Sequence, residues 1–245
     1  MQKTQNDIPD IIKFHKKFIE SNSEKILSPD KKIKSRWMWG LGTNAKIIAL
    51  NYLLLNNKSD AAYWFNKSVE FYMNCLKLYK KGANFGINSS FSETAALHVM
   101  KSAVFSGNKE CINELAGYII KNKPEISLKT NLIYNYVLAV SMLITDDNEL
   151  CEQLKKVVES EDKYKKKIKN YFTGTAKTLE GIVENDAEKI IEGASEMLIE
   201  FNDYSTKNNE LPVCEDLMMI LLIARGKGIE INAPDIWGKY APFIS

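Results

Sequence analysis

The 245-residue sequence predicts an all-α fold of stacked antiparallel helix hairpins, with about nine to ten helices. Apolar residues recur at spacings of three and four along almost the whole chain, with little of the period-two alternation of strands. Helix breakers are scarce, because 12 glycines and 6 prolines compare with about 17 and 12 at average usage. No linker divides the chain, so we expect a single all-helical domain spanning residues 1–245.

The first predicted helix has one apolar face, an N-cap at Asp7 and Pro9 in its first turn. That face consists of Ile8, Ile11, Ile12, Phe14, Phe18 and Ile19. The Pro29–Asp30 pair should interrupt the helical pattern.

The next helices are expected between polar or glycine-containing segments. Residues 37–42 contain two glycines, and we expect a helix to begin after them at Thr43 and to end near Leu55. A further helix should begin at Ser59 or Asp60 and stop at Gly82. Residues 82–90 are the best loop candidate of the first half, and a helix over residues 89–106 follows.

A short polar turn recurs between amphipathic helices. It ends at Asn57, Asn108, Asp147 and Asp186, and the last three of these positions are 39 residues apart. Helix-turn-helix units of about 34 to 47 residues are typical of helical repeat arrays, in which each hairpin covers its neighbour's apolar face. Chance spacing in an irregular helical domain is the alternative, since the units share little sequence outside the turns.

A stripe of carboxylates follows one side of the helix expected after Asp186. Its members are Glu188, Glu192, Glu196 and Glu200. Like charges four residues apart repel, so the stripe lowers helix stability unless cations neutralise it. The preceding helix carries a lysine cluster, but most of it should lie at the opposite end of the hairpin; it comprises Lys163, Lys165, Lys166, Lys167 and Lys169. The stripe is therefore either a solvated face or a docking surface for a basic partner.

An apolar helix is expected over residues 213–223, with Gly226 or Gly228 as a left-handed cap. The tail that follows contains several large apolar residues, so we expect it to pack back on the body of the protein. Asp216 within this helix is interpreted as a paired structural carboxylate.

Composition and motifs point away from catalysis and from cofactors. The chain has two histidines, His15 and His98, and none of the phosphate-binding, zinc-binding or nucleophile motifs. The four cysteines are far apart, so we expect four buried thiols in a reducing compartment; they are Cys75, Cys111, Cys151 and Cys214. We therefore expect no enzyme activity, cofactor or metal.

The charges are nearly balanced, with a formal net charge of +2. Such balance gives no global attraction to nucleic acid or membranes. The longest apolar run has eight residues, well short of the roughly 20 that a membrane helix needs. The polar N-terminus lacks the apolar stretch of a signal peptide. These features predict a cytoplasmic protein without nucleic-acid or membrane partners.

The second half also carries short motifs in a fixed order. Tyr171 and Phe172 open a helix, residues 179–186 (LEGIVEND) turn into the next, and residues 187–201 return. The segments 217–228 (LMMILLIARGKG) and 230–234 (EINAP) follow. In these motifs the chain resembles the all-helical immunity proteins of bacterial polymorphic toxin systems, in particular the immunity protein 49 family. The resemblance implies a cytosolic protein that binds and blocks a cognate toxin, encoded beside it, without catalytic residues.

Three hypotheses on function follow. The first is a toxin-neutralising immunity protein, with the carboxylate stripe as the candidate contact surface. The second is a helical repeat scaffold or regulator that binds peptides or proteins in a groove. The third is an enzyme with an unrecognised site, which would require a deep pocket with perturbed carboxylates around His98 or Asp216.

Overall fold

The computed structural model describes residues 7–80, 91–122, 132–161, 166–208 and 213–232. Within these ranges the chain forms ten α-helices and one 3-10 helix, and it forms no strand. The predicted all-α class is therefore confirmed. The chain divides into two compact units, which we describe separately. Unit 1 contains residues 1–112 and 122–128, and unit 2 contains residues 113–121 and 129–245. The single domain stays a prediction.

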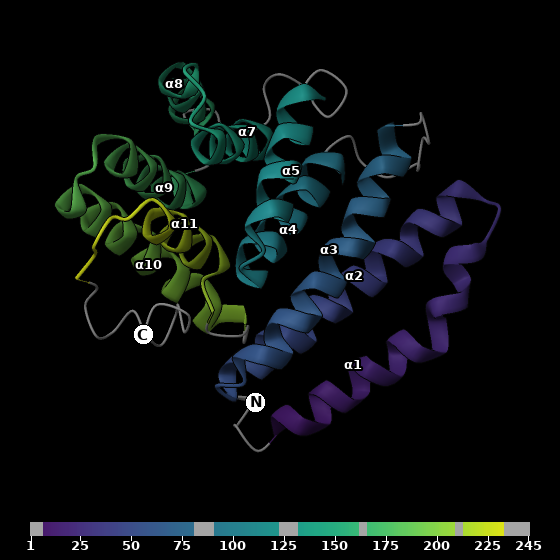
Figure 1. The fold of residues 1–245 in the computed structure, drawn as a ribbon. Helices are drawn as coiled ribbons and strands as arrows, with labels where there is room; N and C mark the ends of the chain where they lie inside the picture. The colour runs from purple at the N-terminus through teal and green to yellow at the C-terminus, as the bar shows by residue number, and fades with distance from the viewer. Residues whose placement is uncertain (1–6, 81–90, 123–131, 162–165, 209–212, 233–245) are drawn as a thin grey trace. The chain divides into compact units, whose positions relative to one another are not determined.

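Unit 1 is a series of helices packed in chain order. They are α1 (Ile8–Asn22), the 3-10 helix η2 (Ser23–Leu27), α2 (Lys31–Leu54), α3 (Lys58–Lys80) and α4 (Phe91–Ser106). Helix α1 packs on α2, α2 on α3 and α3 on α4, as Figure 1 shows. The loop predicted at residues 82–90 lies outside the described residues.

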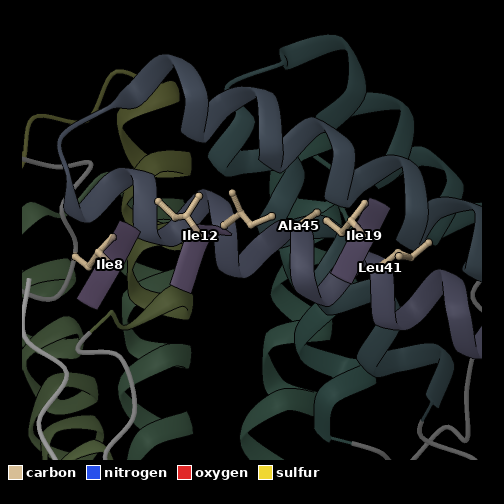
Figure 2. Close-up of a cluster of buried hydrophobic side chains, with 6 residues drawn as sticks. Ile8, Ile12, Ile19, Leu41 and Ala45 are labelled. Atoms are coloured by element: carbon tan, nitrogen blue, oxygen red, sulfur yellow. The ribbon is translucent and has the colours of Figure 1, made fainter. Parts of the chain in front are cut away.

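Helix α1 contributes one narrow apolar face to the core of unit 1. Figure 2 shows Ile8, Ile12 and Ile19 along α1, which belong to one buried apolar cluster with Leu41 and Ala45 of α2. Their spacing of four and seven residues places the three isoleucines on one side of a helix. The prediction that the face includes Phe14 is wrong, because that side chain is 67% exposed. Position 14 is two residues after Ile12, which on a helix is almost the opposite side.

Helix α2 is longer than predicted. Asp30 caps it, since the Oδ1 atom accepts hydrogen bonds from the backbone N–H groups of Lys32 at 2.7 Å and Ile33 at 3.2 Å. The predicted interruption at Pro29–Asp30 is thus confirmed, but the predicted start at Thr43 is wrong. Gly42 lies inside the helix, and glycine suits this position because an added Cβ would be 3.1 Å from ring carbons of Tyr72. Glycine often indicates a helix break, but here it allows the Tyr72 ring to pack closely against α2.

The four predicted turns share one backbone device. Each contains a residue with positive φ followed by an Asn or Asp. The positive-φ residues are Asn56 (55°), Gly107 (71°), Asp146 (54°) and Asn185 (56°). Such a left-handed residue ends an α-helix by satisfying its last carbonyl groups. The next side chain then accepts a hydrogen bond from the following helix, as Asp186 does from Lys189 N at 3.0 Å. The turn predictions are therefore confirmed.

Unit 2 contains the rest of the hairpins. Its helices are most of α5 (Lys109–Lys121), α7 (Leu132–Thr145), α8 (Leu150–Glu161), α9 (Lys166–Glu184), α10 (Ala187–Asn208) and α11 (Glu215–Gly226). Helices α7 to α10 pack in chain order, and α11 packs against both α9 and α10. Gly228 has a φ of 81°, which confirms the predicted left-handed cap. Ile229 is buried, while residues 233–245 of the predicted tail lie outside the described residues.

Candidate partner-binding surface

Helices α9 and α10 approach each other closely enough for backbone atoms to touch. An added Cβ at Gly174 would lie 2.6 Å from the Gly193 carbonyl oxygen, and one at Gly193 would lie 2.6 Å from that of Gly174. At the turn end of the hairpin, an added Cβ at Gly181 would lie 2.8 Å from Ile190 N. Glycine spacing along α9 therefore fixes how the two helices pack. The signal for this role in the sequence is the presence of glycines inside helical patterns.

The interior of this hairpin orients the surface of α10. Ile190, Ala194 and Met197 are fully buried, so positions between them face outward. Thr178 of α9 adds a buried polar contact, donating a hydrogen bond to Gly174 O at 2.7 Å. The packing between α9 and α10 therefore fixes which side of α10 faces outward.

The four predicted stripe residues lie on this outward side. Glu188 and Glu192 are exposed, while Glu196 and Glu200 are partly exposed. Repeating every four residues, they follow the helix surface as expected. The structure therefore places the predicted contact residues where a partner can reach them.

The cation that neutralises the middle of the stripe is Lys177 of α9. Its Nζ atom lies 2.8 Å from Oε2 of Glu192 and 3.1 Å from Oε1 of Glu196. The hydrogen bond to Glu192, followed by that to Glu196, raises the pKa of the Lys177 ammonium. Lysines 163 and 165 of the predicted cluster lie outside the described residues.

The pairing of Lys177 was not predicted, although the sequence contains a signal for it. In an antiparallel hairpin, residues equally far from the turn lie opposite each other. Lys177 is eight residues before Asn185, and the position eight residues after Asp186 falls midway between Glu192 and Glu196.

A second lysine serves the turn end of the hairpin. Lys189 Nζ lies 3.0 Å from Glu184 Oε1 and 3.1 Å from Glu180 Oε2. The hydrogen bond to Glu184, followed by that to Glu180, raises the pKa of the Lys189 ammonium. Two lysines thus hold four of the carboxylates in defined positions.

The hairpin remains strongly acidic after this pairing. Between positions 174 and 201 there are seven carboxylates and two lysines, which give a net charge of −5 in a chain whose total is +2. We call these carboxylates the acidic surface; they are Glu180, Glu184, Asp186, Glu188, Glu192, Glu196 and Glu200. Ile199 lies in the same stretch of α10 and is 69% exposed. Helix α10 therefore carries both exposed carboxylates and one exposed large apolar side chain.

The enzyme hypothesis centres on Asp216 and His98, and both side chains have polar partners in the structure. The hydroxyl group of Tyr136 donates a hydrogen bond to Asp216 Oδ1 at 3.2 Å, which confirms the predicted pairing of that carboxylate. Burial, with Asp216 as a further cause, raises the pKa of Tyr136 well above its usual value.

His98 contacts residues of α2 and α3. Its Nδ1 atom lies 3.1 Å from the Nζ atom of buried Lys46. An ammonium can only donate, so Nδ1 acts as the acceptor. The imidazole stacks on Tyr72, with ring centroids 5.5 Å apart, and meets the edge of Trp39. The half-buried imidazole therefore contacts an ammonium group and two aromatic rings.

The four cysteines are free thiols, but they do not share one environment. Cys75 and Cys214 are buried as predicted, and burial raises the pKa of Cys75 to about 12. The prediction is wrong for Cys151, which is exposed, and Cys111 is only half-buried. Both lie in the first turn of an amphipathic helix, where an apolar residue can fall beside the buried face.

Two features are absent from the described part of the chain. No group of three or more His, Cys, Asp or Glu residues there could hold a metal ion. None of the helices there combines the length and apolar character required to span a membrane.

Comparisons with models of protein families, with curated proteins and with solved structures found no match to this chain.

Proposed function

We propose that this chain is a bacterial cytoplasmic immunity protein, which binds a cognate protein toxin and blocks it by occlusion without catalysis. The observation that carries the proposal is the acidic surface of the α9–α10 hairpin, with its net charge of −5. The motifs that resemble the immunity protein 49 family include this hairpin. Resemblance and charge therefore implicate the same part of the chain.

The chemistry of the acidic surface suits a basic protein partner. Complementary charge speeds diffusional encounter and discriminates against wrong partners. Lys177 and Lys189 hold several carboxylates in place before binding, which lowers the entropy lost when a complex forms. Ile199, 69% exposed, supplies an apolar side chain that a pocket on the partner can bury.

The alternative function is a helical repeat scaffold or regulator. It is favoured by the turns described above, because four turns between consecutive helices share a left-handed residue followed by an Asn or Asp. Such an array would bind several peptides or proteins weakly. An immunity protein would instead bind one partner tightly, with one copy of each chain in the complex.

The first experiment is co-expression with the open reading frame encoded next to this gene. Under our proposal, the neighbouring product stops bacterial growth, this chain restores it, and the two proteins co-purify. An unrelated all-helical protein expressed at the same level serves as control. A neighbour that is not toxic, or toxicity that this chain fails to relieve, would refute the pairing and favour the scaffold.

The second experiment tests the acidic surface itself. Replacing the four stripe glutamates, Glu188, Glu192, Glu196 and Glu200, with Gln should slow association and weaken its dependence on salt between about 50 and 500 mM, over which the Debye length falls roughly threefold. The matched control replaces four exposed glutamates elsewhere with Gln: Glu20, Glu24, Glu70 and Glu110. Both variants lose the same formal charge. Equal kinetics in the two variants would show that the stripe is only a solvated face.

A further inference from the structure

A second surface of distinctive chemistry lies in unit 1, at the corner between η2 and α2. Figure 1 shows this corner at the end of the α1–α2 hairpin where the chain turns back. Leu27 on one side of it is 77% exposed, and Ile33 on the other side is 45% exposed. Asp30 fixes the corner, because its carboxylate accepts two backbone hydrogen bonds at the start of α2. The corner therefore presents apolar side chains on an ordered backbone.

The sequence on either side of these apolar side chains is rich in cations. Residues 23–36 contain five basic and two acidic residues, which give a net charge of +3. The basic residues are Lys25, Lys31, Lys32, Lys34 and Arg36. The Lys25 ammonium lies 4.0 Å from the centre of the half-buried Trp37 ring, a cation–π contact that keeps this charge at the corner. One of the two acids, Asp30, is already engaged with backbone N–H groups.

From this combination we propose that the η2–α2 corner binds reversibly to the surface of an anionic lipid bilayer. Anionic head groups attract lysine and arginine, and the interface beneath them accepts single apolar side chains without a preformed pocket. A stable protein interface would need roughly 800 Å² on each partner, more than two side chains at a hairpin end provide. A nucleic acid would use the lysines but would gain nothing from Leu27 and Ile33.

This surface does not depend on the acidic surface of unit 2, so the two proposals stand or fall separately. The overall charge of +2 led us to expect no membrane partner. That sum conceals a segment of +3 and another of −5 in the same chain. Electrostatic attraction acts over about 8–10 Å at physiological salt, so local clusters matter more than the total.

The test is flotation of the full chain with lipid vesicles. We expect roughly tenfold more protein on vesicles with ~40% phosphatidylglycerol than on pure phosphatidylcholine, and loss of that binding at ~500 mM NaCl. Replacing Leu27 and Ile33 with Ser should lower binding about tenfold, as should replacing Lys31 and Lys32 with Gln. The control replaces two exposed apolar residues elsewhere, Leu55 and Val158, with Ser and should bind as the parent does. All the replaced side chains are exposed, and circular dichroism checks that each variant is folded.

Equal binding to neutral and anionic vesicles, or none to either, would overturn the proposal. It would also be overturned if the lysine variant lost binding while the Leu27 and Ile33 variant kept it. That result would indicate purely electrostatic attraction to a polyanion, and binding to a single-stranded oligonucleotide would then identify a nucleic-acid surface. Failure of any toxin to bind the acidic surface would leave these results unaffected.

Discussion

Gly174 and Gly193 place the backbones of α9 and α10 in direct contact. An added Cβ on either residue would lie 2.6 Å from the carbonyl oxygen of the other, and one at Gly193 would also lie 2.5 Å from Thr178 Oγ1. Real Cβ atoms essentially never come this close to other heavy atoms. The hairpin that carries the acidic surface can therefore form in this geometry only with glycine at both positions.

Replacing Gly193 with Ala should lower the free energy of unfolding by about 3 kcal/mol, because the helices must separate to admit the methyl group. Urea unfolding followed by circular dichroism measures the change. Gly117→Ala in α5 is the matched control, since nothing lies within 4 Å of its added Cβ. That variant should gain about 1 kcal/mol from helix propensity. Equal effects of the two substitutions would contradict the close contact.

The ion pairs of Lys177 give a prediction that links structure to binding. Lys177→Gln leaves Glu192 and Glu196 without this partner and makes the acidic surface more negative. Exposed ion pairs contribute little to folding, so the midpoint of urea unfolding should change little. Association with a basic toxin should become faster and more sensitive to salt. Lys67→Gln, which breaks the exposed pair with Glu70 in unit 1, should leave association unchanged; stopped-flow kinetics of both variants decide the matter.

The turn between α9 and α10 should tolerate glycine but not alanine at position 185. Asn185 has a φ of 56°, where a Cβ-bearing residue costs about 1–2 kcal/mol unless it is Asn or Asp. Asn185→Ala should therefore destabilise unit 2 by about 1 kcal/mol, while Asn185→Gly should be close to neutral. Thermal unfolding of the two variants tests this. A less stable glycine variant would mean that the Asn side chain, rather than its backbone conformation, stabilises the turn.

Tyr136 should make the protein sensitive to alkali. Burial and Asp216 raise the pKa of Tyr136 in the folded state. The contribution of Tyr136 to the free energy of unfolding is therefore fully present below about pH 10, the pKa of an unfolded tyrosine. Above that pH the unfolded chain loses a proton that the folded chain keeps, and stability falls. Tyr136→Phe should cost about 1–2 kcal/mol at pH 7 through the lost hydrogen bond. The difference from the parent should shrink as pH rises above 10; a constant difference would contradict the raised pKa.

Thiol reactivity should follow burial. Cys151 is exposed and should react at once with an aromatic disulfide reagent, whereas the pKa of about 12 leaves Cys75 without thiolate at neutral pH. We expect Cys75 and Cys214 to react only after unfolding in urea, and Cys111 to react at an intermediate rate. Cys151→Ser should remove the fast phase. A fast phase that persists in this variant would show that another thiol is accessible.

Much of the helical pattern was readable from local sequence. The turns at Asn57, Asn108, Asp147 and Asp186 were located correctly, because the chemistry of a helix end involves residues adjacent in the chain. The stripe from Glu188 to Glu200 was also placed on the outward side of its helix. Helical periodicity alone defines such a face.

Other features required knowledge of what each helix packs against. Gly42 was read as part of an interruption, yet it touches the Tyr72 ring from 30 residues away in the sequence. Phe14 and Cys151 were expected in the core, but their helices bury faces that exclude them. The ion pairs of Lys177 join residues on two helices, so their detection needs the hairpin register as well as the residue types.

Local sequence is sufficient to predict the all-α class, the positions of the turns and the acidic character of one helix face. These depend on backbone preferences and periodicity within a single element, which act over a few residues. Three other features follow only from the folded structure: which carboxylates of that face are paired, why glycines lie inside α9 and α10, and that Leu27 and Ile33 are exposed. These features depend on which helices pack together and how closely. Burial and Coulomb interactions between segments distant in the sequence arise only when the chain has folded.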